Sequence, residues 1–476
     1  MDGEWMTDNA SCHGQPAAVG RSRRSVLQAG SLLLGGLGLS DLLRLRAAAG
    51  AAKTVDTAVI LLWLEGGPSH METYDMKPHA PREYRGEFSP IPTRVPGLDV
   101  CELLPRHCEL ANQFSVIRSV THQVPDHPGA AGRFLTGRTP RNISASISDH
   151  PTFDAIVGSM REETSRSGIP QFVSNRARLK GGGQAYLGPT AGPFVVDLLT
   201  PKMSQLPIGP DFDRLDPEFS VANLAVDEHV AERLDDRMAL LNAFDRLRRD
   251  VDSNRLIEAS DRFQQRAVQL LSSSATRDAF DLAREPAAVR DRYGRNTMGH
   301  SALLARRLVE AGCSMVTLDW GRISRKYPTW DDHGDAHHIF DAMKSRLPIY
   351  DRAITALIDD IFQRGLDKRV LVIATGEFGR TPKVNMGRAK TPMWPGRDHW
   401  PGAMSILVSG GGWKMGQVIG QTNNNGEYPA ERILDPNDFI ATVYRFLGID
   451  PGAMMVDHRG RPLPLLPSGE PIRELL

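Results

Sequence analysis

The nine residues from 330 to 338, WDDHGDAHH, bring together three carboxylates and three imidazoles. Carboxylate oxygen and neutral imidazole nitrogen are ligands that Zn²⁺ and Mn²⁺ prefer, and the carboxylates also suit Mg²⁺ or Ca²⁺. No cysteine lies nearby that would indicate a thiolate site. This segment alone leaves two interpretations open, a metal site or a solvated polar loop.

Other segments with the same kinds of side chain lie at residues 65–75, 126–137, 375–382 and 396–401. In the third of them, Glu377 follows an apolar run and is followed by Arg380, whose guanidinium suits bidentate binding of an oxyanion. In the fourth, Asp398 and His399 form another carboxylate and imidazole pair. A single loop histidine usually forms an ordinary hydrogen bond, but several such segments in one chain favour a metal centre.

The elements that must position these residues are visible in the apolar pattern. Short β-branched runs predict buried strands at 57–64, 114–120, 314–318, 369–375 and 404–408. Helical patterns lie at 226–251, 255–271, 302–311, 342–365 and 436–447, the last opened by Asp435 and Pro436. The alternation predicts an α/β fold with a mostly parallel sheet, interrupted by a helical insertion at about 200–300. In such sheets, ligands gather at the carboxyl ends of the strands.

The N-terminus has the pattern of an export signal. Arg23 and Arg24 precede a weakly apolar, glycine-rich stretch at 29–39, and alanines follow at 47–49. This order is typical of the twin-arginine pathway, and the apolar stretch is too short to span a membrane. We therefore expect a signal peptide at 1–52 cleaved near Ala49, a mature domain at 53–476, and a periplasmic or extracellular location. A cytoplasmic protein with a disordered arm is the alternative.

Composition limits the partners. The 57 basic and 57 acidic residues cancel, so nothing indicates a nucleic acid or an anionic lipid surface as partner. No segment after the leader approaches about 20 apolar residues, and we expect no stable membrane span. Cys101, Cys108 and Cys313 remain in the mature chain, an odd number that argues against a disulfide framework. Cys101 and Cys108 could nevertheless pair in an oxidising compartment.

The order of the motifs resembles a known family. The motifs are GGPSH at 66–70, DMKP at 75–78, RSV at 118–120, DHP at 126–128, WDDHG at 330–334, GEFGRTP at 376–382 and DHW at 398–400. Behind a twin-arginine leader, they resemble the family called domain of unknown function 1501, which is placed in the alkaline phosphatase and sulfatase superfamily. The resemblance covers essentially the whole mature chain.

The superfamily implies an alkaline phosphatase-like three-layer α/β sandwich whose site holds one or two divalent metals. By resemblance, Asp331 and His333 correspond to the Asp/His pair of one metal site, and His399 to its late histidine. Glu377 corresponds to the strand-end acid that is usually Asp, and Glu65 lies near the acid after the first strand. The alternatives for this last role are His70, Glu72 and Asp75.

The chain departs from the superfamily pattern at two positions. The ending LTGR at 135–138 matches the sulfatase signature, which places His127 where the nucleophile usually stands. That imidazole could be a metal ligand, a phosphohistidine nucleophile, or the mark of lost activity, and formylglycine chemistry is not expected. Phe378 stands where a histidine commonly follows the strand-end acid, so we expect one metal, with two as the alternative.

These patterns lead to one main hypothesis and one alternative. We expect an exported, metal-dependent hydrolase of small-molecule or glycan phosphate or sulfate esters, using Zn, Mn, Mg or Ca. Arg380 or Arg397 would hold the substrate oxyanion, and His337 is the candidate general base. The alternative is a secreted, non-catalytic binding protein on the same fold, which the histidine in the nucleophile position motivates. The sequence does not specify the substrate, the metal or the number of subunits.

Overall fold

Strands and helices alternate along the chain in the computed structural model, which describes residues 56–162, 168–196, 273–321, 329–387 and 393–476. All of these lie in one unit, Asp56–Leu476. The predicted leader, the predicted helices at 226–251 and 255–271 and most of the predicted insertion lie outside the described residues.

The centre of the molecule is an eight-stranded sheet with the order β14-β4-β13-β8-β1-β7-β5-β6. In that order the strands are Val418–Ile419, Phe114–Val120, Met404–Gly410, Val370–Thr375, Ala58–Trp63, Met315–Asp319, Phe172–Ser174 and Phe194–Val195. β13 runs antiparallel to both of its neighbours, and every other pair in this sheet is parallel. The predicted mostly parallel sheet is therefore confirmed.

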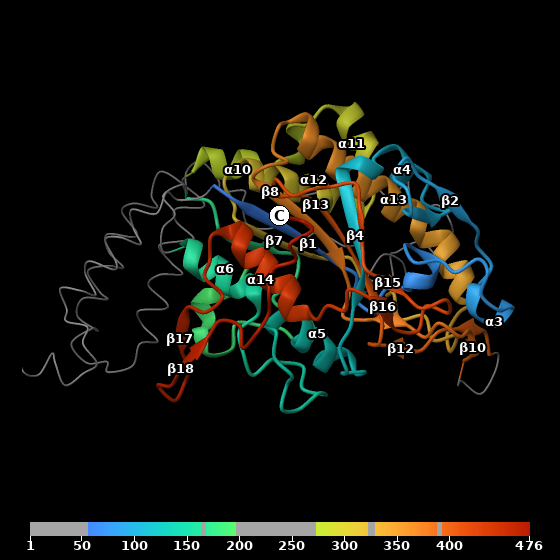
Figure 1. Cartoon of the computed structure of the whole chain (residues 1–476). Helices are drawn as coiled ribbons and strands as arrows, with labels where there is room; N and C mark the ends of the chain where they lie inside the picture. The colour runs from blue at the N-terminus through green and yellow to red at the C-terminus, as the bar shows by residue number, and fades with distance from the viewer. Residues whose placement is uncertain (1–55, 163–167, 197–272, 322–328, 388–392) are drawn as a thin grey trace, which may run out of the picture. The chain divides into compact units, whose positions relative to one another are not determined.

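The sheet is covered on both faces, which explains why its strands are continuous apolar runs. In β1, Ile60 and Leu62 belong to one core, whereas Leu61 and Trp63 belong to the other. The first core is completed by α4 (Pro105–Glu109), α10 (Ser274–Phe280), α11 (Ala287–Tyr293), α12 (Thr297–Glu310) and α13 (Ile339–Gln363). The second is completed by α5 (His127–Thr136), α6 (Phe153–Glu162) and α14 (Pro436–Leu447). The result is the predicted three-layer α/β sandwich (Figure 1).

The last helix shows how local sequence sets an element. Asp435 caps α14 by accepting hydrogen bonds from the backbone amides of Asn437 and Asp438, and the Asp438 side chain accepts from the amide of Asp435. Pro436 occupies the first turn, and Gly448 ends the helix in the left-handed conformation. The predicted start of this helix is confirmed.

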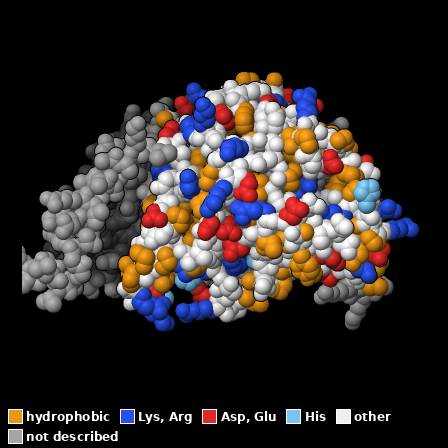
Figure 2. Space-filling model, viewed as in Figure 1, with side chains coloured by type: hydrophobic (Ala, Val, Ile, Leu, Met, Phe, Trp, Pro, Cys, Tyr) orange, Lys and Arg blue, Asp and Glu red, His pale blue; other side chains and the backbone are white. Residues whose placement is uncertain are grey.

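The surface of the molecule carries charges of both signs. On the face seen in Figure 2, Lys and Arg side chains lie interspersed with Asp and Glu, as a charge balance of 57 to 57 suggests. None of the helices in the described ranges is long and apolar enough to cross a membrane.

Cys101 and Cys108 are free in the structure and do not form the disulfide considered from the sequence. The thiol of Cys101 is completely buried at the end of β3 (Asp99–Cys101), and this burial raises its pKa to about 12.

Candidate metal centre

Four side chains from three separate segments converge at the carboxyl edge of the sheet. They are His127, the first residue of α5; Asp331 and His333, in the loop before α13; and His399, in the short strand β12 (His399–Trp400). One ligand atom of each lies within 4.8 Å of those of the other three. β12 pairs with β9 (Gly379–Arg380), which follows β8, so a hairpin places His399 beside the end of a central strand.

The distances suit a metal ion held by nitrogen and oxygen. Asp331 Oδ1 lies 3.1 Å from His127 Nε2, 2.8 Å from His333 Nε2 and 3.1 Å from His399 Nε2. The Nε2 atoms of His333 and His399 are 3.0 Å apart. Metal–ligand bonds of about 2.0–2.1 Å in a tetrahedron place neighbouring ligand atoms roughly 3.3 Å apart. A small outward movement of these side chains would therefore seat an ion.

The other ring nitrogen of each of these histidines faces a hydrogen-bond acceptor. His127 Nδ1 is 2.6 Å from Glu377 Oε1, His333 Nδ1 is 2.6 Å from Asp398 Oδ1, and His399 Nδ1 is 2.7 Å from the Pro125 carbonyl oxygen. A proton on Nδ1 satisfies each acceptor and leaves the Nε2 lone pair directed at the shared space. Metal-binding histidines are typically oriented in this way, so the donor set fits a divalent ion.

Hydrogen bonds within the cluster shift the pKa values of its members. Burial lowers the pKa of His127, but its hydrogen bonds to Asp331 and Glu377 outweigh that effect and raise the pKa to about 9. Burial alone would raise the pKa of Asp331, yet hydrogen bonds from the three histidines and the charge of Arg380 hold it well below its usual range. Bound metal would replace a proton here, as it does at metal sites in general.

Arg380 has a different role from the predicted one. Its guanidinium is completely buried, and Nη2 lies 2.5 Å from Asp331 Oδ1. It also donates to the carbonyl oxygens of Gly66, Gly67 and Arg397. Arg380 is predicted to hold a substrate oxyanion; in the structure its donors are mostly engaged with the protein, and it orients the carboxylate of Asp331.

Arg397, the other residue predicted to hold the oxyanion, is bound to protein groups in the structure. Its side chain is fully buried and donates from Nε and Nη2 to Glu72 Oε1, at 3.1 and 2.6 Å. The remaining donors bind the carbonyl oxygens of Thr381, Pro382 and Tyr84. A guanidinium has five N–H groups, and all of them are occupied. Arg397 therefore stabilises the loop that carries Asp398 and His399.

Two predicted metal ligands lie beside the centre and not in it. Glu377 Oε1 accepts from the His127 ring and from the amide of Gly66, so Glu377 supports a ligand. Glu65 lies near Asp319 and Glu377 and is outside the group of four. Burial, followed by the charges of Asp319 and Glu377, raises the pKa of Glu65 to about 7.

The residues from 330 to 338 contribute partly to the metal centre and partly to the attachment of this loop to α13. Asp331 and His333 belong to the centre, whereas Asp332 is fully buried and binds Arg346 of α13, with Nη1 2.8 Å from Oδ2. His337 is the predicted general base. In the structure its Nε2 lies 2.9 Å from Oδ1 of the buried Asp332. His338 caps α13 by accepting from the amide of Phe340.

Two of the groups that hold the ligands, Asp398 and the Pro125 carbonyl, have little or no signal in the sequence. Asp398 was seen only as part of a pair with His399, although the adjacency of an acid and a histidine is the available signal. The Pro125 carbonyl has no signal in the sequence at all. Gly66 has φ of 111°, and a Cβ there would lie 2.5 Å from the amide nitrogen of Asp331. The glycine thus permits the close approach of two loops.

Fold and centre together define a three-layer α/β protein with a candidate metal site at the carboxyl edge of its sheet. A family model described as "Protein of unknown function (DUF1501)" matches residues 56–476, and the chain belongs to this family. The family predicted from the motifs is thereby confirmed. No curated protein matches the chain in sequence.

Several solved structures are similar in architecture. The PsFucS1 sulfatase from Pseudoalteromonas sp. has 13% identity and a TM-score of 0.34, over 86% of this chain and 70% of that one. The lipoteichoic acid synthase LtaP from Listeria monocytogenes has 8% identity and a TM-score of 0.35, over 84% and 74%. Alkaline phosphatase from the Antarctic bacterium TAB5 has 10% identity and a TM-score of 0.31, over 84% and 99%. At these values none of them assigns an activity to this chain.

Proposed function

We propose that this protein is an exported, metal-dependent hydrolase of phosphate or sulfate esters. The observation that carries the proposal is the convergence of three imidazole Nε2 atoms and one carboxylate, each imidazole being fixed by an acceptor at Nδ1. The family resemblance of the motifs supports the class of substrate. The twin-arginine pattern supports export, because that pathway carries proteins already folded around a cofactor.

The centre is open to a substrate. The side chains of Asp331, His333, His399 and His127 are 32%, 25%, 21% and 14% exposed, in contrast to the closed environment of a structural ion. A divalent metal bound there would polarise an ester oxygen and lower the pKa of a bound water. The protein's own contribution is to keep the four side chains in place and to hold Asp331 through Arg380.

His127 holds the metal in this proposal and is not the nucleophile. Its Nδ1 faces Glu377, and its Nε2 faces Asp331 in the shared space, so neither nitrogen is free to form a covalent intermediate. The ring of Phe378 packs against both His127 and His399, with centroids 5.1 and 4.5 Å away, and it offers no further ligand. We therefore propose one metal ion per chain.

The same observation favours the second candidate, a secreted binding protein that has lost catalysis. A histidine engaged at both nitrogens stands where relatives in the superfamily carry a nucleophile, and such a centre could retain a ligand without turning it over. The two candidates share the metal and differ in turnover.

The test is metal analysis combined with a substrate panel. The mature chain, purified from an unstarved host, is expected to contain about one equivalent of divalent metal by plasma mass spectrometry and to hydrolyse members of a phosphate and sulfate ester panel. His333→Ala should lose both properties, whereas His79→Ala, which removes an exposed histidine, should keep them. Metal-free wild-type protein would refute the metal centre. Stoichiometric metal without turnover of any ester would favour the binding protein.

A further inference from the structure

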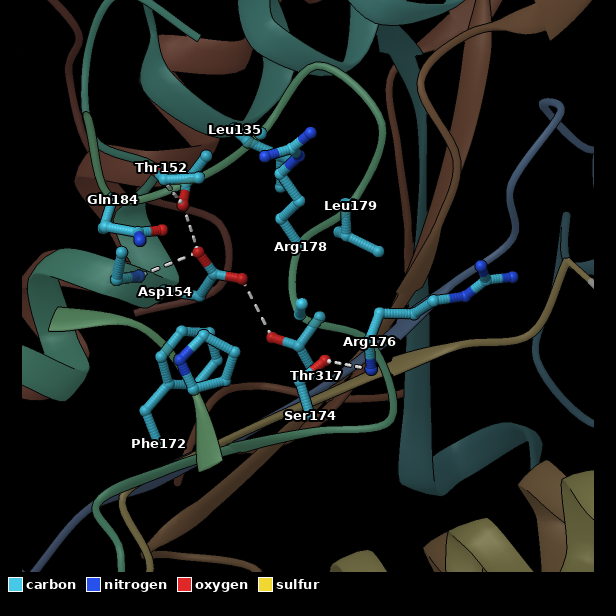
Figure 3. Close-up of a pocket in the computed structure, with 15 residues that line it drawn as sticks. Leu135, Thr152, Asp154, Phe172, Ser174, Arg176, Arg178, Leu179, Gln184 and Thr317 are labelled. Atoms are coloured by element: carbon cyan, nitrogen blue, oxygen red, sulfur yellow. Dashed lines mark hydrogen bonds between the residues drawn. The ribbon is translucent and has the colours of Figure 1, made fainter. Parts of the chain in front are cut away.

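A second hollow lies on the face of the sheet covered by α5 and α6, and we call it the side pocket (Figure 3). It is a narrow hollow that opens to solvent. The strands β5 and β7 form its floor, and the loop from 176 to 184 forms one side. Its principal lining residues are Leu135, Asp154, Phe172, Arg178, Gln184 and Thr317.

The floor of the side pocket is fixed by a buried carboxylate. Asp154 Oδ1 accepts from Thr152 Oγ1 and from the amide of Ala155, and Oδ2 accepts from Thr317 Oγ1 at 3.0 Å. Both oxygens are thus engaged with the protein. Burial raises the pKa of Asp154, which weakens any repulsion of an anion in the space above it. In Figure 3, Asp154 lies between Gln184 and Arg178, with Thr152 above it and Thr317 below it.

The mouth of the side pocket is basic. Arg176, Arg178 and Lys180 alternate along the loop, and Arg176 is paired with Asp319, its Nε lying 2.7 Å from Oδ2. Arg178 is exposed, and within the described part of the chain its guanidinium has no hydrogen-bond or ion-pair partner. An unpaired guanidinium beside a partly apolar hollow is suited to an anionic group on a larger molecule.

The side pocket is joined to the metal centre through α5. The helix begins with His127, and Leu135 lies two turns later, about 12 Å along the axis at 1.5 Å per residue. The loop packs on the first turn of the same helix so closely that a Cβ on Gly181 would overlap the carbonyl oxygen of Pro128. A ligand that reaches both places would lie along one side of α5.

We propose that the side pocket binds a second anionic group of the substrate, with Arg178 as the specificity-determining residue. This inference rests on the proposed ester hydrolysis at the metal centre and adds a substrate class to it. The substrate would be an elongated molecule that carries two or more sulfate or phosphate monoester groups, or one such group and a carboxylate. Its reacting ester would lie at the metal centre, and the other anion would lie beside Arg178 at the mouth of the side pocket.

The experiment uses a molecular ruler. Alkane-α,ω-diol bis-sulfates and bis-phosphates of increasing spacer length, and the matching monoesters, are titrated calorimetrically into metal-loaded mature protein. For the wild type, we expect the bis-esters to bind about tenfold more tightly than the monoesters once the spacer is long enough to join the metal centre to Arg178. Arg178→Ala should abolish this gain and leave monoester binding unchanged.

Two further variants test whether the gain in affinity depends on the side pocket. Ala177→Trp places a large side chain at an exposed position that lines the side pocket, and it should also abolish the gain. Arg94→Ala removes an exposed arginine elsewhere and should keep it. Equal binding of mono- and bis-esters by a wild type that still hydrolyses monoesters would overturn this inference alone. A metal-loaded wild type that neither binds nor hydrolyses any ester would overturn it together with the proposed function.

Discussion

The Nδ1 atom of His127 lies 2.6 Å from Oε1 of Glu377, although 250 residues separate them in the sequence. This contact connects the start of α5 to the loop after β8. The same carboxylate oxygen accepts from the amide of Gly66, after β1. One buried side chain therefore links the loop that carries His127 to two loops beside the metal centre, and the first prediction follows from it.

Glu377→Gln should weaken metal binding about 10- to 100-fold, because an amide oxygen holds an imidazole N–H less strongly than a carboxylate does. The change is nearly isosteric, so the fold should persist. Competition titration with a chromophoric chelator measures the affinity. Glu109→Gln, which alters an exposed carboxylate of α4, is the control and should bind metal like the wild type. Unchanged affinity in Glu377→Gln would show that this hydrogen bond does not support the ligand.

Gly66→Ala tests the close approach of two loops. Gly66 has φ of 111°, and a Cβ would lie 2.5 Å from the Asp331 amide nitrogen. Alanine would therefore suffer both backbone strain and steric overlap, and both destabilise the fold. We expect a loss of roughly 3 kcal/mol in unfolding free energy, with weaker metal binding. Gly97 has φ of 78°, and a Cβ added there would meet nothing within 4 Å, so Gly97→Ala should cost only about 1 kcal/mol. Denaturant titration of the metal-free proteins compares the two, and equal losses would contradict the prediction.

Arg346→Met tests the anchor of the segment that carries Asp331. Arg346 and Asp332 are 1% and 0% exposed, and removing the guanidinium leaves the buried carboxylate with the His337 imidazole in place of a full ion pair. The expected cost is about 3–5 kcal/mol of unfolding free energy. The exposed pair between Arg369 and Asp56 is the comparison, and Arg369→Ala should cost about 1 kcal/mol or less. A small effect of Arg346→Met in urea denaturation would mean that the loop is held by other contacts.

The strands and the position of the site follow from local sequence. Apolar β-branched runs identified β1, β4, β7, β8 and β13, and chemically active residues were expected after such runs. The short strands β5, β6 and β14 were missed because two or three residues carry too little pattern. Strands of this length are defined by their neighbours in the sheet and not by their own composition.

The direction of individual side chains could not be predicted. Asp331 and Asp332 are identical and adjacent, yet one faces the metal centre and the other faces a buried arginine. Arg397 has the type suited to oxyanion binding, but Glu72, 325 residues earlier in the chain, occupies it. Such pairings depend on tertiary packing. The residue types in the centre could therefore be predicted from the sequence, but which side chain contacts which partner could not.

His122 makes stability depend on pH independently of the metal ligands. Its Nε2 donates to the Glu377 carbonyl at 2.7 Å, and its Nδ1 accepts from the Val124 amide, so the folded state requires a neutral ring. Burial lowers its pKa to about 4, below the unfolded value near 6.5. The unfolded chain then binds the extra proton between these values, and stability is present above pH of about 6.5 and lost as pH falls toward about 4.

The expected loss from this residue between pH 7 and 5 is about 2 kcal/mol. His122→Gln should lack that part of the pH dependence, because glutamine can still donate to a carbonyl but does not titrate. His458→Gln, at an exposed position, should keep the wild-type dependence. Urea unfolding of chelator-treated protein at both pH values isolates the effect from metal binding. If the wild type and His122→Gln lose the same free energy, His122 is not held neutral by its burial and its two hydrogen bonds.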